Sequence, residues 1–223
     1  MPRVGAPVQI GLIETMRARE GRVPWLGRHL ARLTASRVAL GAPEPPGDLA
    51  DLVRLAVGTG DRVVRLQLTG GHLEISTRDV SAEQAITVVV ASEVHQPYPH
   101  KTTRREQFGR ALATARSVGA HDAVLVSADG LVAEGTAWNL FWWEDGSLRT
   151  PAEGLGILPG LGRQRVMELT DVKEARVPVA ALAGRSLFLT NAVRGIVEIG
   201  VFAGTPVPRD PRTAELSFAF WPD

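Results

Sequence analysis

The chain has 223 residues, of which 44% are hydrophobic and 22% are charged, and its formal net charge is only +1. A chain of this length and composition can bury a substantial core, but it lacks the basic excess that nucleic-acid-binding proteins use to hold phosphates. The sequence contains no cysteine, which excludes disulfides, thiolate metal sites and cysteine nucleophiles.

The first half of the chain alternates strand patterns with helix patterns. In the first predicted helix, leucines recur at helical spacing, and His29 and Arg32 fall on one face. Asp48 is the predicted N-cap of the second helix. The elements predicted here are strands over 11–17, 62–68, 72–77 and 85–94, and helices over 25–40 and 48–58.

The second half is richer in short strands. Asp129-Gly130 and Asp145-Gly146 are typical turn sequences between strands. The elements predicted here are helices over 104–118 and 161–169, and strands over 123–127, 131–134, 138–143, 147–150, 186–189 and from 196 onward.

The segment His95-Gln96-Pro97-Tyr98-Pro99-His100 separates the two halves. Two prolines in so short a stretch favour an extended connection, because each proline restricts the residue before it to extended conformations. We therefore expect an α+β protein of two lobes, with a small lobe over 1–94, a linker over 95–100 and a larger lobe over 101–223.

The hydropathy pattern does not suggest a membrane protein. No stretch approaches the roughly 20 apolar residues that a membrane-spanning helix needs. The first ten residues, Met1 to Ile10, contain no apolar core of signal-peptide length. We expect a cytoplasmic protein that binds neither membranes nor nucleic acid.

Lysine is rare in this chain, since only Lys101 and Lys173 accompany the many arginines. A lysine amine can form a Schiff base, whereas a guanidinium stays protonated and is not a usable nucleophile, so either lysine is a candidate catalytic group. The five histidines are scattered, and we predict ordinary surface or hydrogen-bonding roles for them rather than a metal site.

Two further segments carry polar chemistry. The glycine-rich run over 154–163 lacks the lysine and hydroxyl of a nucleotide-binding P-loop. It leads into a predicted helix, so it is either an anion site built from free backbone amides or a plain tight turn. Glu134 interrupts an apolar strand region, where a carboxylate lies either near a sheet edge or buried with a partner.

Seven short motifs occur in the order found in class IV aminotransferases, also called fold-type IV pyridoxal-phosphate (PLP) enzymes. They span roughly residues 11 to 200. The sequence thus resembles this family, which implies a two-lobed α+β fold like that of D-amino-acid aminotransferase, with the cofactor between the lobes. The motifs are Ile13-Glu14-Thr15-Met16-Arg17; His29-x-x-Arg32-Leu33 with Ser36 and Gly41; His100-Lys101-Thr102-Thr103-Arg104-Arg105; Asp129-Gly130 followed by Glu134-Gly135-Thr136-Ala137-Trp138-Asn139-Leu140; Thr150-Pro151; Gly156-Ile157-Leu158-Pro159-Gly160-Leu161-Gly162-Arg163; and Thr190-Asn191-Ala192-Val193-Arg194-Gly195.

The resemblance implies a role for three charged residues. Lys101 corresponds to the lysine that carries PLP as a Schiff base, and it would also move protons at the substrate α-carbon. Glu134 corresponds to the carboxylate beside the pyridine nitrogen, which keeps that nitrogen protonated and makes the ring an electron sink. Arg32 corresponds to the phosphate-binding arginine of the H-x-x-R-L helix.

The resemblance also implies a phosphate cup of backbone amides. Those of Leu161 and Gly162 would join those near Asn191 and Ala192. Two departures from the family stand out. Gly162 replaces the threonine that branched-chain enzymes often carry, and Met1 begins close to the Glu-Thr motif, which implies a small lobe shortened at its N-terminal edge.

Within the family, the chain is most similar to 4-amino-4-deoxychorismate lyases, which eliminate pyruvate and leave 4-aminobenzoate for folate synthesis. Thr15 and the Lys101-Thr102-Thr103-x-Arg105 run carry this likeness, although threonine is also a common strand residue. The alternatives are an aminotransferase acting on branched-chain or D-amino acids, or a non-catalytic relative. The resemblance further implies an amino-acid-like substrate and a homodimer.

Overall fold

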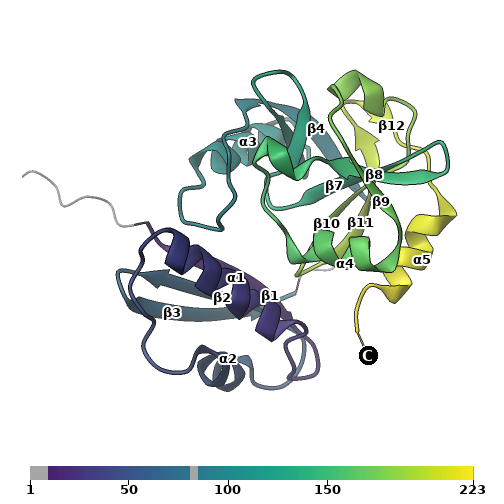
Figure 1. Ribbon diagram of the computed structural model, residues 1–223. Helices are drawn as coiled ribbons and strands as arrows, with labels where there is room; N and C mark the ends of the chain where they lie inside the picture. Colours follow the sequence, from purple (N-terminus) through teal and green to yellow (C-terminus); the bar gives the residue numbers. More distant parts are fainter. Residues whose placement is uncertain (1–9, 81–84, 223) are drawn as a thin grey trace, which may run out of the picture. The chain divides into compact units, whose positions relative to one another are not determined.

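The computed structural model describes residues 10–80 and 85–222, which fold into two compact units (Figure 1). We call the first the N-terminal unit; its described residues are 10–80 and 100–104. The second, the C-terminal unit, comprises described residues 85–99 and 105–222. The chain therefore leaves the first unit and returns to it briefly around Lys101.

The N-terminal unit is a three-stranded antiparallel sheet with two helices packed against it. Its strands follow the order β1-β2-β3. Alternation along β1 sends Leu12, Met16 and Ala18 into a core shared with Leu33 and Val53 of the helices. The elements are β1 (Leu12–Ala18), α1 (Leu26–Ala39), α2 (Leu49–Val57), β2 (Arg62–Thr69) and β3 (His72–Asp79).

The returning segment over 100–104 lies along the first residues of β1. The Ile13 amide donates to the Lys101 carbonyl at 2.8 Å, and the Thr103 amide donates to the Gly11 carbonyl at 2.8 Å. Leu12 and Thr102 thus form an isolated antiparallel bridge. This pairing fixes the backbone of Lys101 against β1.

The C-terminal unit is built on a mixed sheet with strand order β6-β5-β4-β11-β10-β7-β8-β9, and β12 pairs with β11. The β4–β5, β4–β11 and β8–β9 pairs are parallel. The elements are β4 (Ile86–Val94), α3 (Glu106–Ser117), β5 (Asp122–Val126), β6 (Val132–Gly135), β7 (Asn139–Glu144), β8 (Ser147–Pro151), α4 (Leu161–Leu169), β9 (Val172–Ala175), β10 (Leu187–Asn191), β11 (Gly195–Phe202), β12 (Thr205–Pro206) and α5 (Pro211–Ala219).

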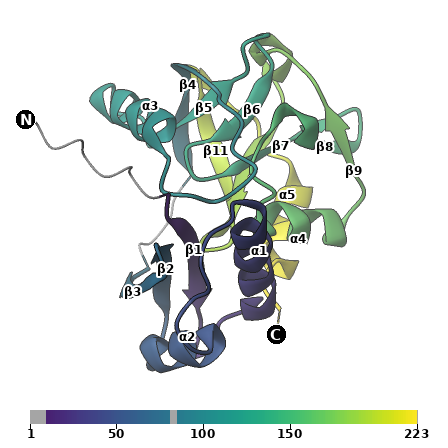
Figure 2. The same ribbon diagram turned by 60° about the vertical axis from the view of Figure 1, so that its left-hand side comes forward.

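Helices pack on this sheet in two places, as Figure 2 shows. Helix α3 lies against β4 and β5, where Phe108 and Ala111 meet Ala123 and Leu125. Val124, between those two strand residues, belongs instead to the main core on the other side of the sheet. Helix α4 contacts β10 and α5 contacts β11.

Most predicted elements are confirmed within one or two residues, and the α+β class is correct. Strand β9 and helix α5 were not predicted. The units also divide differently from the lobes expected at 95–100, because β4 pairs with β5 and β11 of the C-terminal unit. Over the described ranges, no helix is long and apolar enough to cross a membrane.

Candidate active-site residues in the two units

A buried carboxylate organises the N-terminal unit. Glu14 on β1 is 1% exposed and accepts two hydrogen bonds from Arg32, from Nε to Oε1 at 2.8 Å and from Nη2 to Oε2 at 2.7 Å. His29 Nδ1 lies 2.7 Å from the same Oε2. Both partners come from α1, on which residues three apart share a face. The carboxylate therefore holds the Arg32 guanidinium in a bidentate grip.

The electrostatics of this group follow from burial and pairing. Burial raises the pKa of Glu14, but the hydrogen bonds from His29 and Arg32 outweigh it and lower that pKa to about 2. Burial lowers the pKa of His29, and the charges of Arg32 and Lys101 lower it further, against the opposing pull of Glu14. The Lys101 amine thus belongs to the same electrostatic neighbourhood as His29.

Lys101 is half-buried on the segment that pairs with β1. The segment is also tied to α1, because His100 Nδ1 lies 3.1 Å from Ser36 Oγ. Thr15 is half-buried on β1. Because side chains alternate along a strand, Thr15 lies on the face opposite Glu14. The structure thus places Lys101 on the segment that pairs with β1, the strand that carries Thr15, with Glu14 turned to the helix side.

In the C-terminal unit, Glu134 is the penultimate residue of strand β6 and is buried, with 3% of its surface exposed. His95 Nε2 lies 2.9 Å from its Oε1, and the Leu158 amide donates to both carboxylate oxygens at 3.3 Å. Both interpretations left open by the sequence apply, because β6 is an edge strand of the sheet and the carboxylate is also buried with a partner.

A second buried carboxylate shapes the chain after Glu134. Asp122 accepts from the Thr136 amide at 2.9 Å, from Thr136 Oγ1 at 2.8 Å and from Trp138 Nε1 at 3.1 Å. Burial raises the pKa of Asp122, although these donors oppose the shift. The Thr136 carbonyl in turn accepts from Arg105 Nη2 at 2.6 Å. These bonds fix the turn from β6 to β7.

The predicted phosphate segments come together at the start of α4. A Cβ added to Gly162 would lie 2.9 Å from the Cα of Asn191 and 2.8 Å from Thr190 Oγ1, so only glycine allows this close approach. The first-turn amides of Leu161 and Gly162 have no partner within the helix, and Gly160 provides no side-chain cap. Both Leu161 and Ala192 are buried.

These features fit a phosphate group. Asn191 Oδ1 accepts from the amides of Val193 at 2.9 Å and Arg194 at 2.8 Å, which shapes the β10–β11 turn next to α4. Within the described part of the chain, nothing hydrogen-bonds the buried Thr190 Oγ1. Free amides at a helix N-terminus and an orphaned hydroxyl are the donors that an anion requires. The residues present therefore suit the phosphate of PLP.

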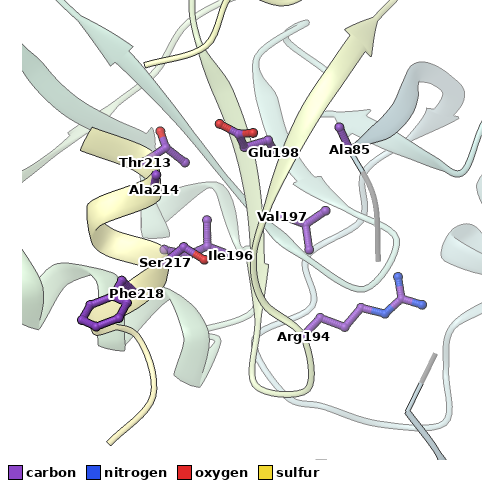
Figure 3. Close-up of a pocket in the computed structure, with 9 residues that line it drawn as sticks. All are labelled: Ala85, Arg194, Ile196, Val197, Glu198, Thr213, Ala214, Ser217 and Phe218. Atoms are coloured by element: carbon purple, nitrogen blue, oxygen red, sulfur yellow. The ribbon is translucent and has the colours of Figure 1, made fainter. Parts of the chain in front are cut away.

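A cavity of about 460 Å³ lies elsewhere in the C-terminal unit, between α5 and β11 (Figure 3). Thr213 and Ser217 of α5 line it, as do Val197 and Glu198 of β11. None of the residues predicted to hold the cofactor lines it, so we do not assign the chemistry to this cavity.

Three residues of these clusters were not predicted to act there: Glu14, His29 and His95. For Glu14 and His29 a sequence signal was present but weak. Glu14 shares one face of β1 with Leu12 and Met16, which is the core face. His29 lies at helical spacing from the leucines of α1. His95 had no such pattern. Among the described residues, no three histidine, aspartate or glutamate side chains gather as a metal site would require.

The comparisons with known proteins agree on one family. The chain matches the model of a family described as "Amino-transferase class IV" over residues 11–201. It is 26% identical over 205 residues to a "Probable branched-chain-amino-acid aminotransferase" of Rickettsia typhi, covering 77% of this chain and 70% of that protein. A protein of the same name from Thermotoga maritima is 31% identical over 96 residues, but the match spans only 40% of this chain and 34% of that protein.

A solved structure extends the comparison to the fold. A Legionella pneumophila protein, provisionally named a 4-amino-4-deoxychorismate lyase, superposes with a TM-score of 0.89 at 23% identity. The superposition covers 98% of this chain and 94% of that one. At this identity the likeness concerns the fold alone.

Proposed function

Because this chain belongs to the class IV aminotransferase family, whose members are PLP-dependent enzymes, we propose that it is a 4-amino-4-deoxychorismate lyase with Lys101 as its cofactor lysine. Its fold is the α+β fold of fold-type IV enzymes. The observation that carries the proposal is the pairing of the Lys101 segment with β1, the strand that bears Thr15.

Each unit contains residues whose chemistry suits PLP. Arg32, oriented by Glu14, and the amides at Leu161 and Gly162 suit the phosphate. Asn191 and Ala192 belong to the turn that packs against Gly162. Glu134, buried and hydrogen-bonded, suits the ring nitrogen. When bound, the cofactor supplies an electron sink for the electron pair released at the substrate α-carbon.

Side chains of the protein would then transfer the proton and orient the substrate. The neutral Lys101 amine takes the proton from the substrate α-carbon. The carbon–oxygen bond to the substrate ring breaks, pyruvate leaves, and formation of the aromatic ring of 4-aminobenzoate favours the reaction. A hydroxyl at Thr15 can hydrogen-bond the lysine amine or the substrate carboxylate, which glycine at this position could not do.

The main alternative is an aminotransferase acting on branched-chain or D-amino acids, and the names of the curated relatives favour the branched-chain substrate. A non-catalytic relative is the other alternative. Retention of Lys101 argues against it, as does that of Arg32 and Glu134 with built hydrogen-bond partners, since a non-catalytic chain has no need of them. We also propose a homodimer, which sedimentation of the PLP-loaded protein would test.

One assay separates these activities. The substrate is supplied by a coupled synthase, and 4-aminobenzoate and pyruvate are followed together; a lyase forms them in equal amounts without an added keto acid as amino acceptor. Lys101→Ala serves as the inactive control. Rapid transfer of an amino group from branched-chain or D-amino acids to 2-oxoglutarate, with no 4-aminobenzoate, would exclude the lyase and retain the family assignment.

A further inference from the structure

The segment that carries His95 is held firmly within the C-terminal unit. The His95 amide donates to the Val126 carbonyl at 2.7 Å. The Gln107 side chain of α3 accepts from the Gln96 amide at 2.7 Å and donates to the Gln96 carbonyl at 2.8 Å. The Tyr98 amide donates to the Gly156 carbonyl at 2.7 Å. A stretch with two prolines is thereby anchored along its length, and the ring of His95 has little freedom.

The His95 ring is buried against the ring of Phe108 and faces Glu134. Only 1% of its side chain is exposed, and Phe108 packs edge-on at 6.4 Å between ring centroids. Its Nε2 lies 2.9 Å from Glu134 Oε1. Its other nitrogen, Nδ1, is buried and lacks a hydrogen-bond partner among the described residues.

This arrangement assigns the proton on the ring. With a proton on Nε2, His95 donates to the carboxylate, and Nδ1 is left as a bare lone pair. A second proton on Nδ1 would bury an N–H group without an acceptor, which is the more costly state. We therefore assign the Nε2 proton to the hydrogen bond with Glu134, so that His95 is a donor that orients the carboxylate.

From this geometry we propose that His95 is a positioning residue for Glu134, fixing its carboxylate toward the protonated ring nitrogen of PLP. The inference rests on the proposed function, which gives Glu134 that role. The His95 hydrogen bond and the Leu158 amide restrict rotation of the carboxylate.

The test compares two ligands in equilibrium binding to the apo protein: PLP, and an analogue in which carbon replaces the ring nitrogen. The measured quantity is the ratio of their dissociation constants. The variants are His95→Leu and His95→Asn, which place no donor at the Nε2 position, and His95→Gln, whose amide nitrogen reaches it. His72→Gln, at an exposed histidine of β3, is the matched control.

We expect wild-type protein and His72→Gln to prefer PLP strongly. The preference should fall roughly tenfold in His95→Leu and His95→Asn, which is the scale of one hydrogen bond to a charged group, and should be largely kept in His95→Gln. If His95→Leu does not fold, His95→Asn decides. A loss of affinity that is equal for both ligands, or an unchanged preference, would overturn the positioning role.

The wild-type arm separates this inference from the proposed function. If borohydride fixes PLP on Lys101 but the wild type binds both ligands equally, Glu134 does not hold the ring nitrogen; the inference about His95 is then wrong, while the cofactor assignment stands. If the wild type binds neither ligand, the proposed function fails and the inference fails with it.

Discussion

Glu14 shows how a single buried residue links stability to the proposed cofactor site. Its carboxylate is nearly fully buried, yet it is ionised because Arg32 and His29 supply hydrogen bonds from α1. A buried ion pair stabilises a fold only when its geometry is good, whereas removing one partner is strongly destabilising. Glu14 is therefore a structural requirement for Arg32, the residue proposed to bind phosphate.

The pKa values of this cluster predict acid sensitivity. Folding lowers the pKa of Glu14 from 4.5 to about 2, so its stabilising contribution is present above pH 4.5 and is lost as the pH falls through about 2. A shift of this size corresponds to on the order of 3 kcal/mol. His29 acts in the same direction, because its lowered pKa means that the unfolded chain takes up the proton first. Urea unfolding followed by circular dichroism between pH 7 and pH 2.5 would measure this loss.

The Glu14→Gln variant should be less stable than wild type at pH 7 and should lose less stability on acidification. Glu74→Gln, at an exposed position of β3, is the matched control and should follow the wild-type curve. Parallel pH curves for Glu14→Gln and wild type would contradict the assignment of the acid sensitivity to this cluster.

Arg32→Ala and Glu134→Ala should fail in different ways. Loss of Arg32 removes a charged hydrogen bond to phosphate, so PLP affinity should fall roughly ten- to a hundredfold, and saturating PLP should restore much of the rate. Loss of Glu134 removes the carboxylate that keeps the ring nitrogen protonated, so saturating PLP should not restore the rate even where it restores binding. Arg110→Ala, at an exposed position of α3, is the control. Full rescue of Glu134→Ala by PLP would contradict its role at the ring nitrogen.

The sequence predicted the candidate site residues better than it predicted the residues that contact them. Motif order led to Lys101, Arg32 and Glu134, but a motif does not say what a side chain contacts. His95 was interpreted as one of several ordinary histidines, because it and His100 flank the two prolines of the expected linker. Its burial depends on contacts with α3 and on the turn at Gly156, which are distant in sequence and leave no local periodic signal.

At the scale of elements, the close contact between α4 and the β10–β11 turn creates the proposed phosphate cup. Gly162 lies where the first turn of α4 meets the Asn191 backbone. Branched-chain enzymes often carry threonine at this position, but here the space for a side chain is already filled. The glycine and the close approach of the turn are therefore one structural feature, and the backbone amides become the principal donors.

Gly162→Ala should disturb this contact. Its Cβ would lie 2.9 Å from the Asn191 Cα, so the backbone must shift, with a loss of stability on the order of 1–3 kcal/mol and weaker PLP binding. Gly109→Ala in α3 is the matched control, because a Cβ at this position would have no atom from outside the helix within 4 Å. Alanine there should slightly stabilise the helix. Thermal melts and PLP titration would measure both effects. Unchanged PLP affinity in a folded Gly162→Ala protein would contradict the cup.

Elements with strong local signals were predictable, and those fixed by distant contacts were not. Asp48 caps α2 as predicted, accepting from the Ala50 amide at 2.7 Å. In contrast, β9 is a short, half-exposed edge strand that exists because it pairs with β8, and α5 buries only Thr213 and Leu216 along its length. Pairing and packing, rather than propensity, decide such elements.

At the scale of the whole molecule, the chain folds as two units, and the proposed cofactor residues are divided between them. Lys101, Arg32 and Thr15 belong to the N-terminal unit, and Glu134, Leu161, Gly162, Asn191 and Ala192 belong to the C-terminal unit. Proline content alone suggested a lobe boundary at 95–100, but β4 pairs into the second sheet and residues 100–104 pair with β1. Long-range strand pairing therefore decides the division.

The central claim is that Lys101 carries the cofactor. The most direct measurement is borohydride reduction of the PLP-loaded protein, followed by peptide mapping by mass spectrometry. Lys173, exposed on β9, is the internal control because it is the other lysine of the chain. We predict that the phosphopyridoxyl group is found on Lys101 and that Lys101→Ala abolishes the label in a folded protein. A label on Lys173, or on neither lysine, would contradict the claim.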